Sequence, residues 1–327
     1  MAYGQRAFLR KDLERGRSAG RPTAIPPRGW GDVLIRVKQE VKRDDVPLLA
    51  AGVAFFALLA LVPSLVALVS LYGLVADPAD IQRNVDDVLA AAPREVRDLV
   101  ESQLSSIVDS SPQGLRLGAL AGLVVALWSA SSGMKHLIAA INRAYDEEET
   151  RGFLRLRGLA LLLTIGAVLG LLVALAALVV APNSLSGDGS MRVLRAVVLV
   201  IQWPLLAAGA MVALAILYRY APDRSEARWN WVSPGAVVAT LVWVVASVGF
   251  TVYTANFGRY NETYGALGAV VVVMLWLYIS AYVAIAGAEL NAELERQTAR
   301  DTTTGRPEPM GQRDAYVADT LGESPDR

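Results

Sequence analysis

The residue types that carry most enzyme chemistry are scarce in this chain. Of its 327 residues one is a histidine, His136, and none is a cysteine. Disulfide bridges, thiolate metal sites, iron–sulfur clusters and sites with several imidazole ligands are therefore excluded. The acidic run from Asp146 to Glu149 has no glycine-rich phosphate-binding loop beside it, so we interpret it as a solvated helix end. The sequence predicts no catalytic residues, no metal and no cofactor.

A first group of candidate functional residues lies in and just after a long apolar stretch. Its aromatic and hydroxyl side chains are unusual in an apolar helix, and its charged side chains fall near the expected membrane boundary. We interpret the group as substrate-binding or gating residues: Trp128, Ser129, Ser132, Lys135, His136, Asn142, Arg143 and Tyr145. For Lys135 we favour a position among the lipid headgroups over an ion pair. His136 is interpreted as a structural group, not as a proton relay.

A second group lies near the last apolar stretch. Tyr253, Asn256, Tyr260 and Tyr264 surround the turn that precedes this stretch, where they either anchor the helices at the interface or gate a headgroup or solute. Glu289 and Asn291 follow the stretch and complete the candidate residues. For Glu289 we favour an ion pair with a lysine at the same depth, because a polar face continues there.

The elements that must position these residues are transmembrane helices. Hydrophobic residues make up 54% of the chain and charged residues 19%, a balance that soluble domains of this size seldom show. A helix needs about 20 apolar residues to cross a hydrocarbon core of about 30 Å. Six stretches reach that length: 48–76, 117–141, 158–181, 196–218, 231–255 and 265–288. The predicted fold class is all-α, an integral membrane protein with six transmembrane helices.

The distribution of basic residues predicts the topology. Eleven lysines and arginines precede residue 48, and the loops on the same side carry more of them than the opposite loops do. The positive-inside rule then places both termini in the cytoplasm. Residues 1–29 and 297–327 are polar and rich in glycine or proline, so we expect two disordered tails around a membrane domain of residues 30–296. Valines spaced by four before the first span suggest a short amphipathic helix on the inner leaflet, or a topology signal alone.

The loop of residues 77–114 has its own helical pattern. Its apolar residues recur with helical spacing on both sides of Pro93, which suits a first helical position. We therefore expect two amphipathic extracytoplasmic helices between the first and second spans. They form either a lid or a structural collar.

Several motifs of the chain resemble the YihY/virulence factor BrkB family. They are LWSAS near residue 127, NRAYDEEETR near 142, YRYAP near 218, YGALG at 264 and GAELNAE at 287. The resemblance covers roughly residues 30–296. It implies a bacterial cytoplasmic-membrane protein of six helices and little about chemistry. The family's older label, ribonuclease BN-like, conflicts with the scarcity of histidine and of charge within the spans, and we treat it as inherited naming.

Three functions compete on the sequence alone. The first is a transporter or flippase of a lipid-like or envelope-related substrate, because the apolar interior holds hydroxyl and aromatic groups without a deep carboxylate. The second is a non-transporting membrane scaffold or envelope assembly factor, for which we expect a tightly filled bundle. The third, a nuclease, is disfavoured. A net charge of zero also argues against nucleic acid as a partner, leaving membrane lipids and a lipid-like substrate; no oligomeric state is indicated.

Overall fold

The computed structural model describes residues 14–75, 112–175, 177–178, 190–256 and 266–323. Within these residues the regular structure is helical, apart from one isolated bridge between Ala227 and Thr303. The helices, in chain order, are η1 (Pro22–Ala24), α2 (Pro27–Arg43), α3 (Val46–Val75), α6 (Pro112–Ala144), α7 (Phe153–Leu175), α9 (Ser190–Tyr220), α10 (Trp229–Asn256), α12 (Ala266–Glu295) and α13 (Tyr316–Asp319).

The long helices coincide with the apolar stretches of the sequence. Helices α6, α7, α9, α10 and α12 each contain an apolar window long enough to cross a membrane. Helix α3 passes the same test together with α2, from which it is bent by 61°. The bend follows from Asp45, whose left-handed backbone (φ 48°) ends α2 before α3 begins. The predicted all-α, multi-span membrane fold is confirmed.

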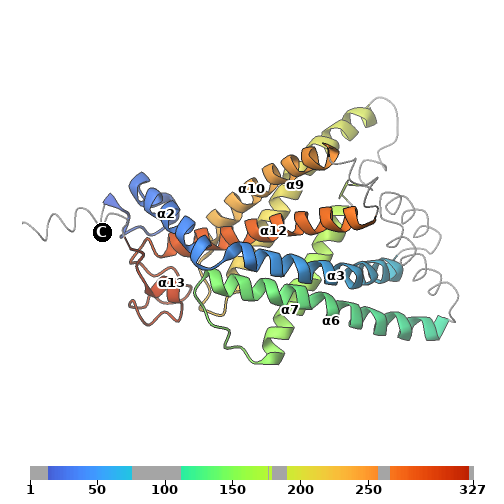
Figure 1. Cartoon of the computed structure of the whole chain (residues 1–327), viewed down its shortest axis with the longest axis horizontal. Helices are drawn as coiled ribbons and strands as arrows, with labels where there is room; N and C mark the ends of the chain where they lie inside the picture. Colours follow the sequence, from blue (N-terminus) through green and yellow to red (C-terminus); the bar gives the residue numbers. More distant parts are fainter. Residues whose placement is uncertain (1–13, 76–111, 176, 179–189, 257–265, 324–327) are drawn as a thin grey trace, which may run out of the picture.

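Helix α12 is the central element of the bundle. It packs against α10 on one side and against α3 on the other, and it also contacts α2 and α6. Helix α9 packs on α10, while α6 packs on both α3 and α7. The α9–α10 pair therefore joins the α3–α6 pair mainly through α12, and Figure 1 shows the two pairs diverging from one shared end.

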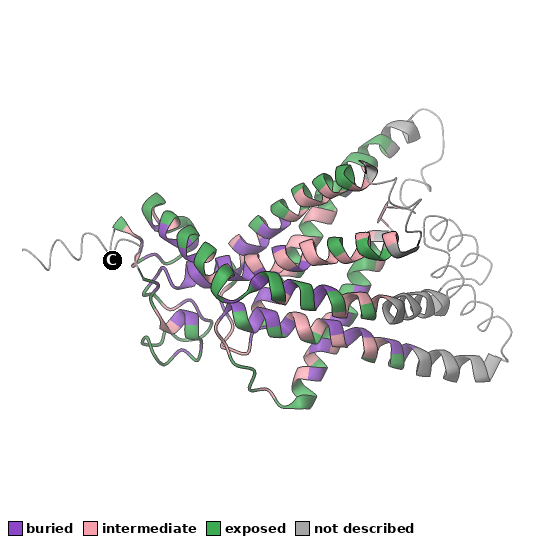
Figure 2. Ribbon diagram, viewed as in Figure 1, coloured by how far each residue is buried: buried purple, intermediate pink, exposed green. Residues whose placement is uncertain are grey.

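Buried residues concentrate at that shared end, as Figure 2 shows in purple. In α12 the buried positions begin at Ala281, and no described residue before it is buried. In α10 the buried positions end at Thr240. Farther along both helices the described side chains are exposed or half-buried and mostly apolar, which suits contact with lipid. We call the shared end, where α2, the last turns of α6 and α12 and residues 297–323 meet, the polar end.

The described parts of the two tails are packed against the polar end, which differs from the expectation of disorder. The Arg17 side chain donates hydrogen bonds to the backbone oxygens of Arg296 (3.1 Å) and Gly322 (2.5 Å). The Thr298 hydroxyl donates to the Ala19 oxygen at 2.6 Å. Arg313 is 5% exposed. The composition of the tails predicts disorder because they contain few apolar residues. Hydrogen bonds from side chains to backbone oxygens hold these segments in place of apolar burial.

The expectation for the amphipathic helix before the first span is met only in part. Helix α2 forms, but Val33 and Val37 pack against Trp231, Leu290 and other residues of α10 and α12, so this face contacts protein. Its outer face exposes apolar and basic side chains. The extracytoplasmic helices expected in residues 77–114 fall almost wholly outside the described residues, and the cytoplasmic placement of the termini stays a prediction.

Candidate functional site

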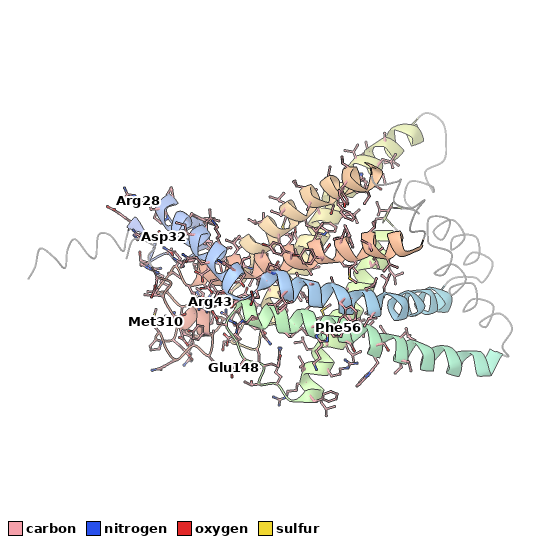
Figure 3. The ribbon with its side chains drawn as sticks, viewed as in Figure 1. Arg28, Asp32, Arg43, Phe56, Glu148 and Met310 are labelled. Atoms are coloured by element: carbon pink, nitrogen blue, oxygen red, sulfur yellow. The ribbon has the colours of Figure 1, made fainter. Side chains whose placement is uncertain are left out.

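Buried ion pairs tie α2 and the end of α6 to α12. The Arg36 guanidinium on α2 donates to the Glu293 carboxylate and, at 2.8 Å, to the Gln297 amide oxygen. Arg296 donates to Glu293 at 3.0 Å and to Asp146, which follows α6, at 2.6 Å. Charge-assisted bonds of this kind are the stronger ones in proteins, and here they fix three elements at one place. Figure 3 shows Asp32 and Arg43 on α2 beside this region, with Glu148 and Met310 at the same end.

A second buried ion pair joins the segment after α9 to the last residue of α12. Both terminal nitrogens of Arg224 donate to the Glu295 carboxylate, at 3.2 and 2.8 Å, and the Thr302 hydroxyl donates to it at 2.5 Å. The side chains of Arg224 and Glu295 are 2% and 0% exposed. Burial lowers the pKa of Arg224, but the adjacent Glu295 carboxylate more than compensates and raises it. Arg224 therefore stays charged.

Asn142 links the loop after α6 to the loop after α9. Its Nδ2 donates to Glu149 at 2.9 Å, and its Oδ1 accepts the backbone N–H of Asp223 at 2.8 Å. The N–H and the hydroxyl of Thr150 both donate to the Asp223 carboxylate at 2.7 Å. Burial raises the pKa of Asp223, but these two bonds and the Arg151 guanidinium together lower it below its usual value. Asn142 is thus a structural bridge.

Asn291 holds α12 against α10. Its Oδ1 accepts the N–H of Gly235 at 2.7 Å, and its Nδ2 donates to the Val232 oxygen at 3.0 Å. Both backbone groups flank Pro234, which lacks an N–H and disturbs the helix ladder around it. The Asn291 side chain provides hydrogen-bond partners for both backbone groups. Asn291 was predicted as a candidate functional residue, and the structure gives it this structural role.

Glu289 and Tyr145 are buried at the polar end without hydrogen-bond partners for one oxygen each. Glu289 is 1% exposed and its Oε1 has no partner, as is also true of the Tyr145 hydroxyl. Burial raises the pKa of Tyr145, so the phenol stays neutral. Lys135 is exposed. Among the described residues no ion pair joins it to Glu289, so the interpretation of Glu289 as an ion-pair partner is not supported.

The polar residues of α6 face two neighbouring helices. Trp128 and Ser132 contact α7 through Arg157, whose guanidinium lies 4.0 Å above the Trp128 ring and donates to the Trp128 backbone oxygen at 2.5 Å and to the Ser132 hydroxyl at 3.3 Å. His136 stacks on Phe56 of α3 with 3.5 Å between ring centroids, in the apolar part of the bundle where Figure 3 labels Phe56. The structure thus brings these candidates to the α3–α6–α7 packing faces.

The remaining candidates are scattered. Arg143 is exposed and pairs with Asp44 at 3.1 Å. Tyr253 is 43% exposed and its ring stacks on that of Phe250. Ser129 is half-buried. Asn256 ends α10 but its side chain is not among those described, and Tyr260 and Tyr264 lie outside the described residues. The predicted gate at this turn therefore stays a prediction.

A polar hollow of about 580 Å³ opens at the polar end. Carboxylates dominate its lining, with Arg224 as its basic member: Asp146, Glu147, Glu148, Thr150, Asp223, Arg224, Ser225, Asp314 and Tyr316. Burial raises the pKa of Glu147, although the Tyr316 N–H partly offsets this by donating to it. Among the described residues no group of three or more His, Asp or Glu side chains is placed to hold a metal ion.

Sequence reasoning missed the arginines. Arg36, Arg157 and Arg224 make the buried contacts that join α2, α7 and the segment after α9 to their neighbours. Arg157 and Arg224 lie just outside apolar stretches and Arg36 lies in the basic segment before the first one, and a basic residue at such places is interpreted as a topology signal. A usable signal existed for Arg157, because it is followed by 30 charge-free residues and so enters the membrane with its helix.

Comparison with known proteins assigns the chain to a family. The model of the family described as "Virulence factor BrkB" matches residues 37–311. The chain belongs to the virulence factor BrkB family. Its match with this BrkB model includes α2 from Val37, all the long helices and the start of the C-terminal segment. Much of the polar end lies inside the family region, whereas Arg36 and residues 312–323 lie outside it.

Relatives of this BrkB-family chain are named as membrane proteins or by an older enzyme label. It is 34% identical to a ribonuclease-like protein, YfkH, of Bacillus subtilis (strain 168), over 76% of this chain and 90% of the relative. It is 28% identical to a UPF0761 membrane protein of Alteromonas mediterranea, over 77% of this chain and 84% of the relative. No solved structure gives a significant match.

Proposed function

We propose that this BrkB-family membrane protein is a transporter or flippase that moves a lipid-like molecule across the bacterial cytoplasmic membrane. One observation carries the proposal. In α10 and α12, burial is confined to the polar end: the described parts of α10 beyond Thr240 and of α12 before Ala281 hold no buried side chain. A scaffold is expected to be filled along its whole length. Helix pairs that diverge toward one side offer an apolar path that a lipid can enter from the bilayer.

The character of the divergent halves supports a lipid-like substrate over a hydrophilic one. Their exposed side chains are largely aliphatic, as at Val245, Val248 and Val271. One polar contact crosses between them, where the Trp243 Nε1 donates to the Ser280 hydroxyl at 2.9 Å. A wall of this kind gives a hydrated ion or sugar little to bind, whereas acyl chains lie against it without cost.

The test is lipid movement in vesicles. The purified protein is reconstituted into phosphatidylcholine vesicles that carry a trace of headgroup-labelled fluorescent phospholipid, and a membrane-impermeant reductant bleaches the outer leaflet. Protein-free vesicles bleach by about half when the label is evenly distributed, and we expect active protein to raise that fraction. An unrelated helical membrane protein controls for leakage. Bleaching equal to that of the control, from protein shown to be folded, overturns the proposal.

The scaffold function is kept as the alternative because of the C-terminal segment. Residues 297–323 are held at the polar end and expose Met310, Tyr316 and Leu321, which are 38%, 48% and 44% exposed. Apolar side chains on an ordered, water-facing segment suit a protein partner. A partner that co-purifies with the wild-type chain and is lost from a Tyr316→Ser variant, with no lipid movement, would favour this function.

We further propose that the chain is not a nuclease, although one relative is named ribonuclease-like. The described residues offer no cluster of metal ligands, and metal-dependent hydrolysis of RNA needs one. Incubation of the purified protein with RNA and Mg²⁺ or Mn²⁺ is expected to leave the RNA intact. Cleavage that co-elutes with the protein through two chromatographic steps would overturn this.

A further inference from the structure

Arg157 is a buried cation inside a membrane helix. It is the fifth residue of α7 and is 8% exposed. Its guanidinium lies between α7 and α6, held by the Trp128 ring, the Trp128 backbone oxygen and the Ser132 hydroxyl. All three contacts are electrically neutral. They orient the guanidinium but leave its charge uncompensated.

The described part of the chain supplies Arg157 with no carboxylate. The other buried arginines there each have one: Arg36 has Glu293, Arg224 has Glu295 and Arg296 has Asp146. No described acidic side chain lies within 4.0 Å of Arg157, the limit for an ion pair. The Nε of Arg157 is buried and also lacks a partner. A buried charge without a counter-ion is costly in a bilayer, so an anion from outside the chain is the natural completion.

The neighbouring side chains indicate where that anion comes from. Trp128 is 48% exposed, so the outer part of its ring faces the bilayer region, and Lys135 lies two turns farther along the same face of α6. Lys135 is itself exposed and has no acidic partner within the described residues. An exposed indole and an exposed lysine on this face of α6, next to the buried Arg157 guanidinium of α7, match the phosphate and glycerol region of a phospholipid.

The position of Arg157 along the two helices is unusual. Measured along α7 it lies four residues, about 6 Å, from the helix start. Measured along α6, its contact Trp128 lies sixteen residues, about 24 Å, from the helix end. Figure 1 shows α7 crossing α6 steeply, which reconciles the two values. A phosphate held by Arg157 therefore sits deep relative to α6.

We propose that Arg157, with Trp128, Ser132 and Lys135, binds the phosphate of an anionic phospholipid at the contact between α6 and α7. The assignment of this phospholipid as the transported substrate rests on the proposed function. Binding of the lipid at the site is measured independently of transport. Arg157 supplies the fixed charge, Trp128 covers one face of the guanidinium, and Lys135 adds the second cation that favours an anionic headgroup over a zwitterionic one.

Matched variants test the site. Arg157→Gln removes the charge and keeps a polar side chain, whereas Arg155→Gln removes the same charge from an exposed position two residues away. Native mass spectrometry in mild detergent measures the binding of phosphatidylglycerol, phosphatidylcholine and diacylglycerol. For phosphatidylglycerol we expect Arg157→Gln to lose about tenfold in affinity and Arg155→Gln to stay within about twofold. Equal affinity of Arg157→Gln and wild type overturns the site, as does equal retention of diacylglycerol and phosphatidylglycerol.

A second measurement covers the case in which Arg157→Gln fails to fold. Photoactivatable phosphatidylglycerol is cross-linked to the wild-type protein, and we expect the adducts to concentrate in peptides that contain Trp128 or Arg157. Adducts spread evenly over the lipid-facing helices overturn the site. Inorganic phosphate is added as a competitor. If the true ligand is a soluble anion, the added phosphate suppresses the adducts, and the assignment of a phospholipid as the ligand is overturned.

The two proposals fail separately. If phosphatidylglycerol binds at Arg157 and no lipid moves in vesicles, the site stands and transport falls. If lipid moves equally well in the wild type and in Arg157→Gln, transport stands, and Arg157 is not part of the transported substrate's site.

Discussion

At the scale of single residues, the buried ion pair of Arg224 and Glu295 allows a direct test of what stabilises the polar end. Removing one partner leaves the other charged in a place without water, which typically costs about 3–5 kcal/mol. We expect Glu295→Gln to lower the free energy of unfolding in detergent by an amount in that range. Denaturant unfolding followed by circular dichroism measures it.

The control for this prediction is an exposed pair on the same end of the molecule. Arg43 is bonded to Glu40 and to Asp146, each at 3.1 Å, but its side chain is 58% exposed. Solvent screening limits such pairs to about 1 kcal/mol or less. Arg43→Gln should therefore change stability far less than Glu295→Gln does. Equal effects would mean that burial does not decide the strength of these ion pairs.

At the scale of helices, the contact between α10 and α12 depends on two glycines. A β-carbon on Gly235 would collide with the Gly287 backbone oxygen and lie 2.6 Å from the Asn291 amide, and one on Gly287 would lie 2.8 Å from the Ala239 β-carbon. Close approach of membrane helices requires small residues at such crossings. We expect Gly235→Ala to lower the melting temperature and to weaken the packing at the polar end.

The matched control for this substitution lies on the same helix. A β-carbon added to Gly249 of α10 meets no atom within 4 Å. Replacing a helical glycine by alanine without a collision is usually favourable by about 0.5–1 kcal/mol. Gly249→Ala should therefore leave the melting temperature equal or higher. A similar fall in both variants would contradict the close-approach explanation for Gly235.

The contacts of Asp223 with Thr150 and Arg151 predict that the stability of the protein depends on pH. The folded pKa of Asp223 is depressed because Thr150 and Arg151 stabilise its charged form. Its contribution is therefore fully present above the unfolded value of 3.8 and is lost as pH falls through the lower folded value. Asp223→Asn should be less stable than wild type near neutral pH, and its melting temperature should fall less on acidification below about pH 4. Parallel acid profiles of the two proteins would contradict this.

At the scale of the whole molecule, the terminal segments close the polar end. The Ala299 N–H donates to the Arg17 oxygen at 2.8 Å, and the Gly322 N–H donates to the Arg296 oxygen at 3.0 Å. Hydrogen exchange should therefore be slow at these amides, whereas a disordered tail exchanges at the intrinsic rate. Arg313→Gln should speed the exchange, because Arg313 donates to the Ala299 and Ala318 oxygens at 2.9 and 2.5 Å. Arg306→Gln, at an exposed position, should not.

The sequence predicted the spans well and the polar contacts poorly, for a physical reason. Membrane spans follow from local hydrophobicity, so each long helix lies within a few residues of its predicted range. Contacts such as that of Arg36 with Glu293 join residues 257 positions apart, and no local pattern encodes them. Asn142 and Asn291 were predicted as candidates because they lie just beyond the ends of apolar stretches and within the family motifs. In the structure Asn142 joins the Glu149 carboxylate to the Asp223 backbone, and Asn291 joins two backbone groups of α10.

The central helix of this bundle is also the last long one to leave the ribosome. Arg36 is synthesised 257 residues before Glu293, which at 5–20 residues per second corresponds to a delay of roughly 13–50 s. During that time α3 and α10 lack α12, the helix that joins them. Arg36 and Arg224 have been synthesised, but their carboxylate partners on α12 have not. A nascent chain that stops before α12 keeps the α3–α6 and α9–α10 contacts but lacks the helix that joins the two pairs, and its unpaired charges distinguish it from the finished protein.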